Sequence, residues 1–407
     1  MRLDESEDKM KKIAAFLTAF VLFVITVTVI HFSLRGHIGM DRPEFGTWYS
    51  HYKDIAGDVV AQEMGEDTLT VFGSSEFRHG RETAWHPANF FKDRDVPLML
   101  IGGPYNQCLN HSLSLGAIEK NMQTRKAVLL ISPTWFYKRG VSENHYSLRF
   151  SENNYMAFIS NRKIRRSVRK YVAKRSEKLL GSDPAMQSNI KIYDKLFISG
   201  KDNLFTRLFF NIRRAYVSDK DKIALKVAMN FISKKEKSGV RFAGVRGCSG
   251  GIDWEEVINC ARKSSRYDAD NKYWIRNDVW KRDFKAGEKK AKDRHRKVTF
   301  KKSPEYGDLR CFLDVCRDCD IKPMIIVMPL NGRWYDYTGM NKKTRKYLYS
   351  RIKAVGKEYG AEVADLSKYE YDKYVMKAGR HSIPLRASSP TSEALRRTTI
   401  GLFVKKS

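Results

Sequence analysis

The chain has 407 residues, of which 42% are hydrophobic, so it can bury a core as one large α/β domain with extra segments or as two domains. Its formal net charge of +30 favours a polyanionic partner, namely nucleic acid, anionic lipid headgroups or an anionic polymer. Nucleic acid is not expected as a partner, because no zinc finger, RNP-like stretch or helix-turn-helix pattern accompanies the charge.

The N-terminal segment predicts a membrane anchor. Residues 13–34 (IAAFLTAFVLFVITVTVIHFSL) contain no Asp, Glu, Lys or Arg and are long enough to cross a bilayer as a helix. A cleaved signal peptide is the alternative, but the apolar stretch exceeds the usual signal-peptide core and no small-x-small cleavage site follows closely. Three lysines in residues 1–12 precede the span, whereas Arg35 and Arg42 follow it. The small positive-inside bias places the N-terminus in the cytoplasm and residues 35–407 outside the cell membrane.

Five apolar, β-rich runs predict the strands of a central sheet, because runs that are apolar on both faces suit parallel strands covered by helices. They are TLTVFGSS (68–75), PLMLIGG (97–103), KAVLLISP (126–133), KPMIIVMP (322–329) and AEVADLS (361–367). Helical patterns at 106–122 and 341–360 supply crossovers. The predicted fold class is therefore α/β, a doubly wound and mostly parallel sheet.

Residues at about 147–300 interrupt this alternation and predict a basic, mainly helical insertion. Within it, residues 161–178 (NRKIRRSVRKYVAKRSEK) carry Lys or Arg at nine positions, with apolar residues at helical spacing between them. We expect this helix to bind an anionic membrane or polymer, and the alternative is a solvated face. The candidate contacts are Arg165, Arg166, Arg169 and Lys170. The charged segment 281–302 predicts an exposed helix or loop.

The six cysteines do not predict a metal site. Cys316 and Cys319 form one C-x2-C pair inside an amphipathic helical pattern, and no second pair stands at zinc-ligand spacing. We interpret them as buried or partly exposed thiols. A disulfide between Cys248 and Cys260 is the alternative for that pair in an oxidising compartment.

The first predicted strand ends in Gly73-Ser74-Ser75. One broad class of esterases presents its nucleophile at this position, because the tight turn exposes the hydroxyl above the sheet and the N–H groups at the next helix start can stabilise an oxyanion. Such a serine needs a histidine to take its proton and a carboxylate to orient that histidine. A purely structural role as the N-cap of the next helix is the alternative.

Five blocks of sequence resemble the DltD family in both their residues and their order. They are VFGSSEF, GGPYNQCLNHSLSLGA, LLISPTWF, VMPLNGRWYDYTG and DLSKYEYDKYVMK. The family consists of membrane-anchored proteins of teichoic acid D-alanylation in Gram-positive bacteria, and the resemblance runs from the anchor to about Lys377. It implies an extracytoplasmic fold similar to SGNH hydrolases and a role in transferring D-alanine esters onto lipoteichoic acid. The implied partners are lipoteichoic acid, an anionic membrane, a membrane acyltransferase and a D-alanyl carrier protein. No metal or organic cofactor is expected, since serine acyl chemistry needs none.

The resemblance also implies roles for individual residues. In the SGNH superfamily the nucleophile is the third residue of a Gly-Asp-Ser block. Alignment of that block with Gly73-Ser74-Ser75 implies Ser75 as the nucleophile, with Ser74 as the alternative. The expected oxyanion donors are the N–H of Ser75, the glycine-rich end of the second strand at Gly103, and the side-chain amide of Asn106 or Gln107, which can equally cap the following helix. His111 is expected to be structural.

The loop after the fourth strand carries three aromatic residues, Trp334, Tyr335 and Tyr337. They can form a wall of the acceptor groove, since flat amphipathic rings suit glycerol or sugar units. Packing of the loop itself is the alternative.

The family's acid and base form an Asp-x-x-His pattern near the C-terminus. In this chain Ala378 occupies the aspartate position and His381 the histidine position. The match stops after Lys377, and the tail 378–407 has one acidic and six basic residues, which suggests a shifted reading frame and a poorly active polypeptide. The competing functions are a non-catalytic membrane scaffold that binds teichoic acid, a D-alanyl thioesterase, which requires a cytoplasmic domain, and a related O-acetyltransferase.

Overall fold

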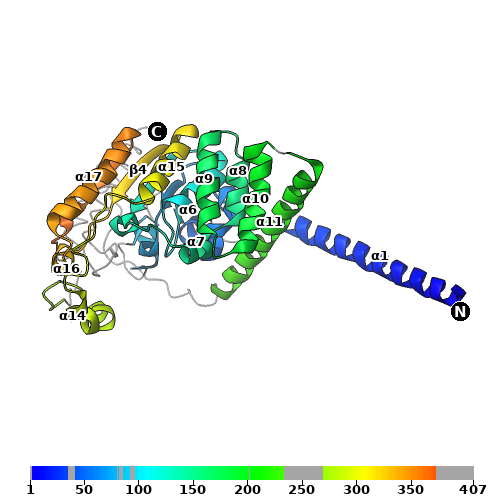
Figure 1. Cartoon of the computed structure of the whole chain (residues 1–407), viewed down its shortest axis with the longest axis horizontal. Coiled ribbons are helices and arrows are strands. Elements are labelled where there is room, and N and C mark those ends of the chain that lie inside the picture. The colour runs from blue at the N-terminus through cyan, green and yellow to red at the C-terminus, as the bar shows by residue number, and fades with distance from the viewer. Residues whose placement is uncertain are drawn as a thin grey trace.

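A computed structural model describes residues 2–34, 42–79, 81, 86–91, 97–200, 202–232 and 269–372. The N-terminal helix α1 (Arg2–Ser33) projects away from an α/β domain (Figure 1). Residues Asp8–Ser33 are a candidate membrane span by length and composition, and the apolar window of this span is not buried against the domain. A signal sequence passes the same test, so the anchor and its orientation stay predictions.

Five parallel strands form the described sheet, in the order β2-β1-β3-β4-β5. This finding confirms the predicted α/β class and all five strand runs. The chain adds β2 on one side of β1 and β3 on the other, so the strand order reverses beside β1. The strands are β1 (Leu69–Phe72), β2 (Leu98–Ile101), β3 (Lys126–Ile131), β4 (Lys322–Val327) and β5 (Glu362–Asp365).

The two faces of the sheet belong to two separate hydrophobic clusters. In β3 the side chains of Leu129 and Ile131 enter the larger cluster, and those of Val128 and Leu130 enter the smaller one, as the alternation of a strand requires. The larger cluster packs beneath long helices (Figure 1). These are α6 (Cys108–Ile118), α8 (Glu152–Ser160), α15 (Glu305–Asp318) and α17 (Lys342–Glu358).

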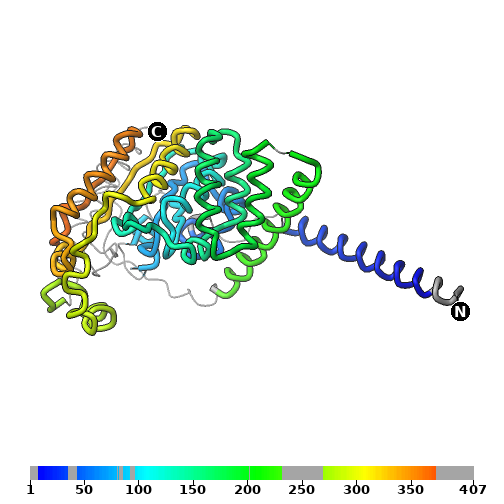
Figure 2. Tube along the Cα trace, viewed as in Figure 1, coloured from blue at the N-terminus to red at the C-terminus, as the bar shows by residue number. Residues whose placement is uncertain are grey.

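A helical layer connects β3 to β4, which are neighbours in the sheet although far apart in the chain (Figure 2). Its main helices are α7 (Glu143–Arg149), α8, α9 (Arg166–Leu179), α10 (Pro184–Asp194) and α11 (Leu204–Ile232). The described part of the predicted insertion is thus mainly helical. The short element η4 (Lys195–Ser199) lies between α10 and α11. Shorter elements after α11 are α13 (Asn277–Val279), η5 (Trp280–Phe284), η6 (Lys285–Gly287) and α14 (Glu288–Ala291).

Side-chain caps fix several helix starts. The Ser151 hydroxyl accepts the N–H of Asn154 at α8, and Asn341 accepts the N–H of Thr344 at α17. The remaining short elements are α2 (Arg42–Thr47), α3 (His51–Ile55), α4 (Gly57–Gln62), η1 (Ser75–Arg78), α5 (Pro87–Phe90), η2 (Glu119–Asn121), η3 (Pro133–Phe136), α16 (Gly332–Tyr337) and η7 (Ser367–Tyr369).

Four of the cysteines are buried free thiols, which confirms the interpretation of the C-x2-C pair. They are Cys108, Cys311, Cys316 and Cys319. Cys248 and Cys260, the candidate disulfide, lie outside the described residues.

Candidate serine site at the carboxyl edge of the sheet

The candidate nucleophile turn follows β1. The strand ends at Phe72, and the N–H of Gly73 then donates to the carbonyl oxygen of Ile101, the last residue of β2, at 3.0 Å. Ser75 begins the short helix η1. Parallel strands end at one edge of a sheet, so this turn lies beside the loop after β2, and the strand order reverses on the other side of β1, between β1 and β3.

Ser74 and Ser75 differ in burial and in hydrogen bonding. Ser74 is 4% exposed, and its Oγ donates to the carbonyl oxygen of Gly103 at 3.0 Å. Ser75 is only partly buried, and its hydroxyl makes no hydrogen bond, capping or otherwise, within the described part of the chain. Of the two side chains, that of Ser75 is therefore the more exposed, whereas the hydroxyl of Ser74 ties two loops together.

Glu76 is a buried carboxyl group that sequence patterns did not single out. Its Oε1 accepts the N–H of Ser74 at 2.6 Å. Burial raises the pKa of Glu76 to about 7, although the N–H groups of Glu76 and Ser74 act in the opposite direction. A Cβ at Gly73 would lie 2.7 Å from this Oε1, so the turn requires glycine there. The one sequence signal for Glu76 is its position directly after the serine pair.

The loop after β2 packs directly on the serine turn. Gly102 has a φ of +135°, and a Cβ at this position would lie 1.9 Å from the carbonyl oxygen of Gly73. The N–H of Gly102 donates to Oδ1 of the buried Asp54 at 3.1 Å. Burial raises the pKa of Asp54 to about 6, and the charge of neighbouring Lys53 opposes that rise. Both glycines are therefore needed for the close approach of the two loops.

A cation that sequence patterns did not reveal borders the same loop. The Nε of Arg149, at the end of α7, donates to the carbonyl oxygen of Pro104 at 2.7 Å, and its Nη1 lies 3.0 Å from Nδ1 of His51. Burial and the charge of Arg149 lower the pKa of His51 to about 4, so His51 is a neutral acceptor. A Cβ at Gly103 would lie 3.5 Å from Arg149 Nη1. No sequence spacing links these residues, because they meet only through the tertiary fold.

Asn106 and Gln107 lie between this loop and α6. Asn106 is buried, and neither its Oδ1 nor the Oε1 of Gln107 has a hydrogen-bond partner among the described residues. Gln107 occupies the cap position of α6 without a side-chain cap bond, and Glu305 accepts the N–H of Cys108 instead, at 2.8 Å. The capping alternative is therefore wrong for Gln107, and the role of either amide as an oxyanion donor stays a prediction.

His111 is fully buried in α6. Its ring lies 5.5 Å from that of Phe72 and 6.1 Å from that of Trp135, measured between centroids. Burial lowers its pKa to about 3, and the backbone of Gly73 acts in the opposite direction. A neutral imidazole enclosed by aromatic rings has the environment of a packing residue.

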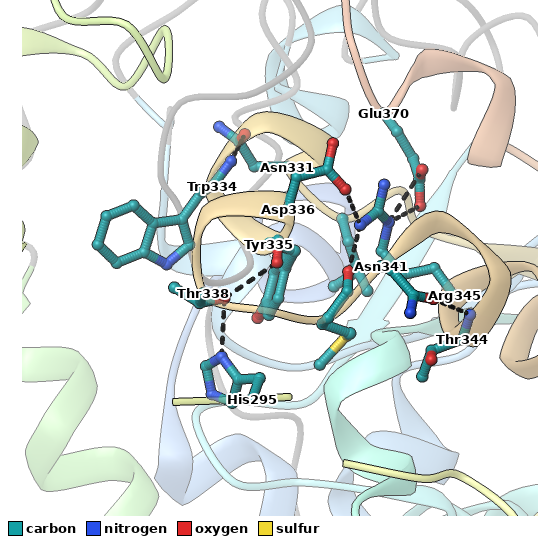
Figure 3. Close-up of polar contacts among 12 residues, drawn as sticks. His295, Asn331, Trp334, Tyr335, Asp336, Thr338, Asn341, Thr344, Arg345 and Glu370 are labelled. Atoms are coloured by element: carbon teal, nitrogen blue, oxygen red, sulfur yellow. Dashed lines mark hydrogen bonds and ion pairs between the residues drawn. The ribbon is translucent and has the colours of Figure 1, made fainter. Parts of the chain in front are cut away.

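Trp334 and Tyr335 lie on α16, the helix that follows β4, and both are buried. The ring of Trp334 packs edge-on against Tyr273 and Phe284, each at 5.0 Å. Asn331 caps the helix by accepting the N–H of Trp334 at 3.0 Å (Figure 3). These contacts are those of the loop-packing alternative, and a groove wall made by either ring stays a prediction.

The last described segment is fixed by a buried cation. The guanidinium of Arg345 on α17 pairs with Glu370 at 3.0 Å and with Asp336 at 2.7 Å, and Arg345 itself is fully buried (Figure 3). Glu370 directly follows η7, which lies at the carboxyl end of β5. The chain is therefore held at the same edge of the sheet as Ser75 two residues before its description ends. Ala378, His381 and the tail lie outside the described residues.

The arginines of the basic helix make contacts within the protein. Arg165 donates to Asp318 at 2.7 Å and to Asp314 at 2.8 Å, which fixes the start of α9 to α15. Arg166 and Arg169 donate to backbone carbonyl groups, of which the nearest to Arg169 is Ile159 at 2.9 Å. Lys170 is exposed and has no partner within the described ranges. Binding of a polyanion by this helix stays a prediction, with Lys170 the one free charge of the four candidates.

Comparison with known proteins identifies relatives over most of the chain. The family model described as DltD protein matches residues 48–382. The chain is 29% identical to Protein DltD of Bacillus subtilis over 90% of its own length and 91% of the relative. It is 23% identical to Protein DltD of Staphylococcus aureus, with 80% of each chain covered, and 24% identical to that of Lacticaseibacillus rhamnosus, with 80% and 77% covered. The family match ends one residue beyond His381 and does not include residues 383–407.

Proposed function

Since the chain belongs to the DltD family, we propose that it acts in the D-alanylation of teichoic acid, with Ser75 as the nucleophile that passes D-alanyl groups to lipoteichoic acid. One observation carries the choice of nucleophile. The hydroxyl of Ser75 is partly exposed and unbonded in the described part of the chain, whereas that of Ser74 is buried and bonded to Gly103. A structural serine has the second environment, and an attacking serine needs the first.

The proposed reaction is two successive acyl transfers. The Oγ of Ser75 attacks the carbonyl carbon of a D-alanyl ester, and the base takes the hydroxyl proton. The oxyanion collapses, the donor leaves as an alcohol with that proton, and D-alanyl-Ser75 remains. A hydroxyl group of lipoteichoic acid then attacks the acyl-serine and restores the Ser75 hydroxyl. The proposed oxyanion donors are the N–H groups of Ser75 and Gly103 and the amide of Asn106 or Gln107, which lie at the same edge of the sheet.

His381 is the proposed base. Three strand spacings separate β5 from β1, which is about 14 Å, and the nine residues from Asp372 to His381 span up to about 30 Å when extended. Chain length therefore permits the contact. Ala378 stands at the position of the orienting carboxylate, and loss of that group from a triad lowers the rate by about 10⁴. We accordingly propose a weak enzyme in this polypeptide.

We propose that α1 anchors the protein with its N-terminus in the cytoplasm and its domain outside, next to lipoteichoic acid and the membrane acyltransferase of the pathway. A protease added to intact cells then digests the domain. Protection of the domain would instead support the thioesterase alternative, whose substrate is a D-alanyl carrier protein in the cytoplasm.

A serine-directed fluorophosphonate tests the nucleophile on the full-length protein in detergent. Ser75→Ala should abolish labelling, and the neighbouring change Ser74→Ala is the matched control that should retain it. Labelling lost only in Ser74→Ala would reassign the nucleophile. The absence of labelling in a folded wild-type chain would favour the non-catalytic scaffold, which the alanine at position 378 makes the leading competitor.

A further inference from the structure

Helix α11 presents an unusual apolar face to solvent. Large hydrophobic side chains cover it from end to end, and Leu204 and Phe205 are more than 80% exposed. Soluble surfaces rarely carry so many exposed apolar side chains along one helix. The exposed members are Leu204, Phe205, Leu208, Phe209, Ile212, Tyr216, Ile223, Val227 and Phe231.

The same helix has a second, buried face. Phe210, Val217, Leu225 and Met229 pack into the domain core. The exposed stripe is therefore not needed to fold the helix onto the domain. An amphipathic helix needs one apolar face for packing, and α11 has two.

The candidate membrane span meets the exposed stripe near its middle. Residues 205, 208, 212, 216, 219, 223 and 227 follow each other at spacings of three or four, so Asp219 occupies the stripe between Tyr216 and Ile223. The Oδ2 of Asp219 lies 2.7 Å from Nδ1 of His31, near the end of α1. Figure 1 shows α1 leaving the domain beside α11, which runs across the end of α1. The carboxylate of Asp219, the acidic group within the stripe, is therefore bonded to a histidine of the candidate membrane span.

We propose that the exposed stripe of α11 lies in the membrane interface, with its apolar side chains in the boundary between headgroups and acyl chains. The occupant is lipid, because the stripe is continuous with the exposed apolar surface of α1 at the His31–Asp219 contact. Helix α11 also carries six basic residues, of which Arg214 and Lys226 have no ion pair within the described part of the chain and suit anionic headgroups around an interfacial helix. The other four pair with acidic residues of the protein. The basic residues are Arg207, Arg213, Arg214, Lys220, Lys222 and Lys226.

The consequence is a two-point attachment of the domain. A single span leaves a domain free to swivel, whereas a long helix held in the interface fixes which face of the domain meets the bilayer. The inference rests on α1 as a membrane span and is independent of the serine chemistry.

Site-specific photo-crosslinking tests this inference on the full-length protein, reconstituted alone in vesicles of phosphatidylglycerol and phosphatidylcholine. p-Benzoylphenylalanine replaces Phe205 or Tyr216 in the stripe, Phe20 in the span as a positive control, and Tyr347 on α17 as an exposed aromatic control away from the stripe. Mass spectrometry then counts lipid adducts. We expect adducts at 205 and 216 approaching the level at 20 and several-fold above the level at 347.

Adducts at 205 and 216 no higher than at 347 would overturn the inference, and so would their absence at 20. Cross-links from 205 or 216 to residues 233–268 of the same chain would also overturn it, because that segment would then be the occupant. The same variants in native membranes give a further test, since a cross-link to another protein in place of lipid would show a protein interface. Fluorophosphonate labelling of Ser75 does not depend on any of these outcomes, so the two proposals fail separately.

Discussion

The hydroxyl of Ser74 is bonded to the carbonyl oxygen of Gly103 at 3.0 Å, and this contact joins the loops that follow β1 and β2. Two adjacent serines in one turn thereby have different tasks. One is a buried connection between loops, and the other is left partly exposed above the sheet edge.

This difference predicts opposite effects on stability and on reactivity. Ser74→Ala should lower the free energy of unfolding by about 1 kcal/mol, because it removes a buried hydrogen bond. Ser75→Ala should change it by no more than about 0.5 kcal/mol, since that side chain is partly exposed and unbonded among the described residues. Urea unfolding of the full-length protein in detergent measures both. A larger loss in Ser75→Ala than in Ser74→Ala would contradict the assignment.

Glu76 predicts a pH-dependent stability. Its pKa rises on folding from an ordinary 4.5 to about 7, so the folded state favours the protonated carboxyl. The favourable contribution is complete below pH 4.5 and is lost as the pH rises to about 7, a change of about 3 kcal/mol. Glu76→Gln keeps an oxygen for the N–H of Ser74 and should flatten this part of the curve. Unfolding free energies of both proteins at pH 4.5, 6 and 7.5 provide the measurement, and parallel curves would show that Glu76 is not the source of the pH dependence.

The Arg345 cluster predicts a large effect from one residue. Arg345→Ala leaves the carboxylate of Glu370 buried without its cation, and loss of one partner of a buried pair costs about 3–5 kcal/mol. Asp336→Asn is the matched control, because the side chain of Asp336 is 44% exposed, so solvent screens its pairing with the buried Arg345 and its loss should cost about 1 kcal/mol or less. Thermal unfolding monitored by circular dichroism compares the two. Equal shifts in both variants would show that burial does not set the strength of these pairs.

An exposed lysine row on α9 allows a sharper test of polyanion binding. Lys170, Lys174 and Lys178 follow each other at four-residue spacing, are exposed and have no partner among the described residues. Their triple replacement by Gln should weaken retention on immobilised lipoteichoic acid by about a hundredfold at low salt, at about 1 kcal/mol for each of the three charges. The difference should shrink as salt screens the charges.

Arg165→Gln is the control for the lysine row. It breaks the pairs with Asp314 and Asp318, so it should lower stability while leaving retention of the folded protein nearly unchanged. Equal retention of the triple variant and the wild type at every salt concentration would show that this row is only a solvated face.

The sequence predicted the elements that depend on local pattern. All five strand runs and the helices α6, α9, α15 and α17 follow from their periodicity, since buried faces repeat every two residues in strands and every 3.6 in helices. The position of the serine turn at the carboxyl edge of the sheet follows from the strand that precedes it.

Tertiary contacts could not be predicted in the same way. Arg165 looked like a free charge, and its partners Asp314 and Asp318 are about 150 residues away in the chain. The roles of Arg149 and Asp54 depend on loops brought together only in the folded sheet. The second apolar face of α11 was hidden because an amphipathic pattern does not show which of its apolar positions will be covered.

The connection between β3 and β4 has a kinetic consequence. The pair Lys126 and Lys322 lies 196 positions apart, whereas the pair Leu69 and Leu98 of β1 and β2 lies 29 apart. Closing the longer loop costs about 1.7 kcal/mol more chain entropy, so we expect β3–β4 pairing to be the last step of sheet assembly. In pulsed hydrogen exchange during refolding, the N–H of Met328, which donates to Ile131, should gain protection later than the N–H of Gly73, which donates to Ile101. Until that step the chain is two partial sheets, each with an unpaired strand edge that can pair with another molecule, so aggregation during refolding should begin at the edges of β3 and β4.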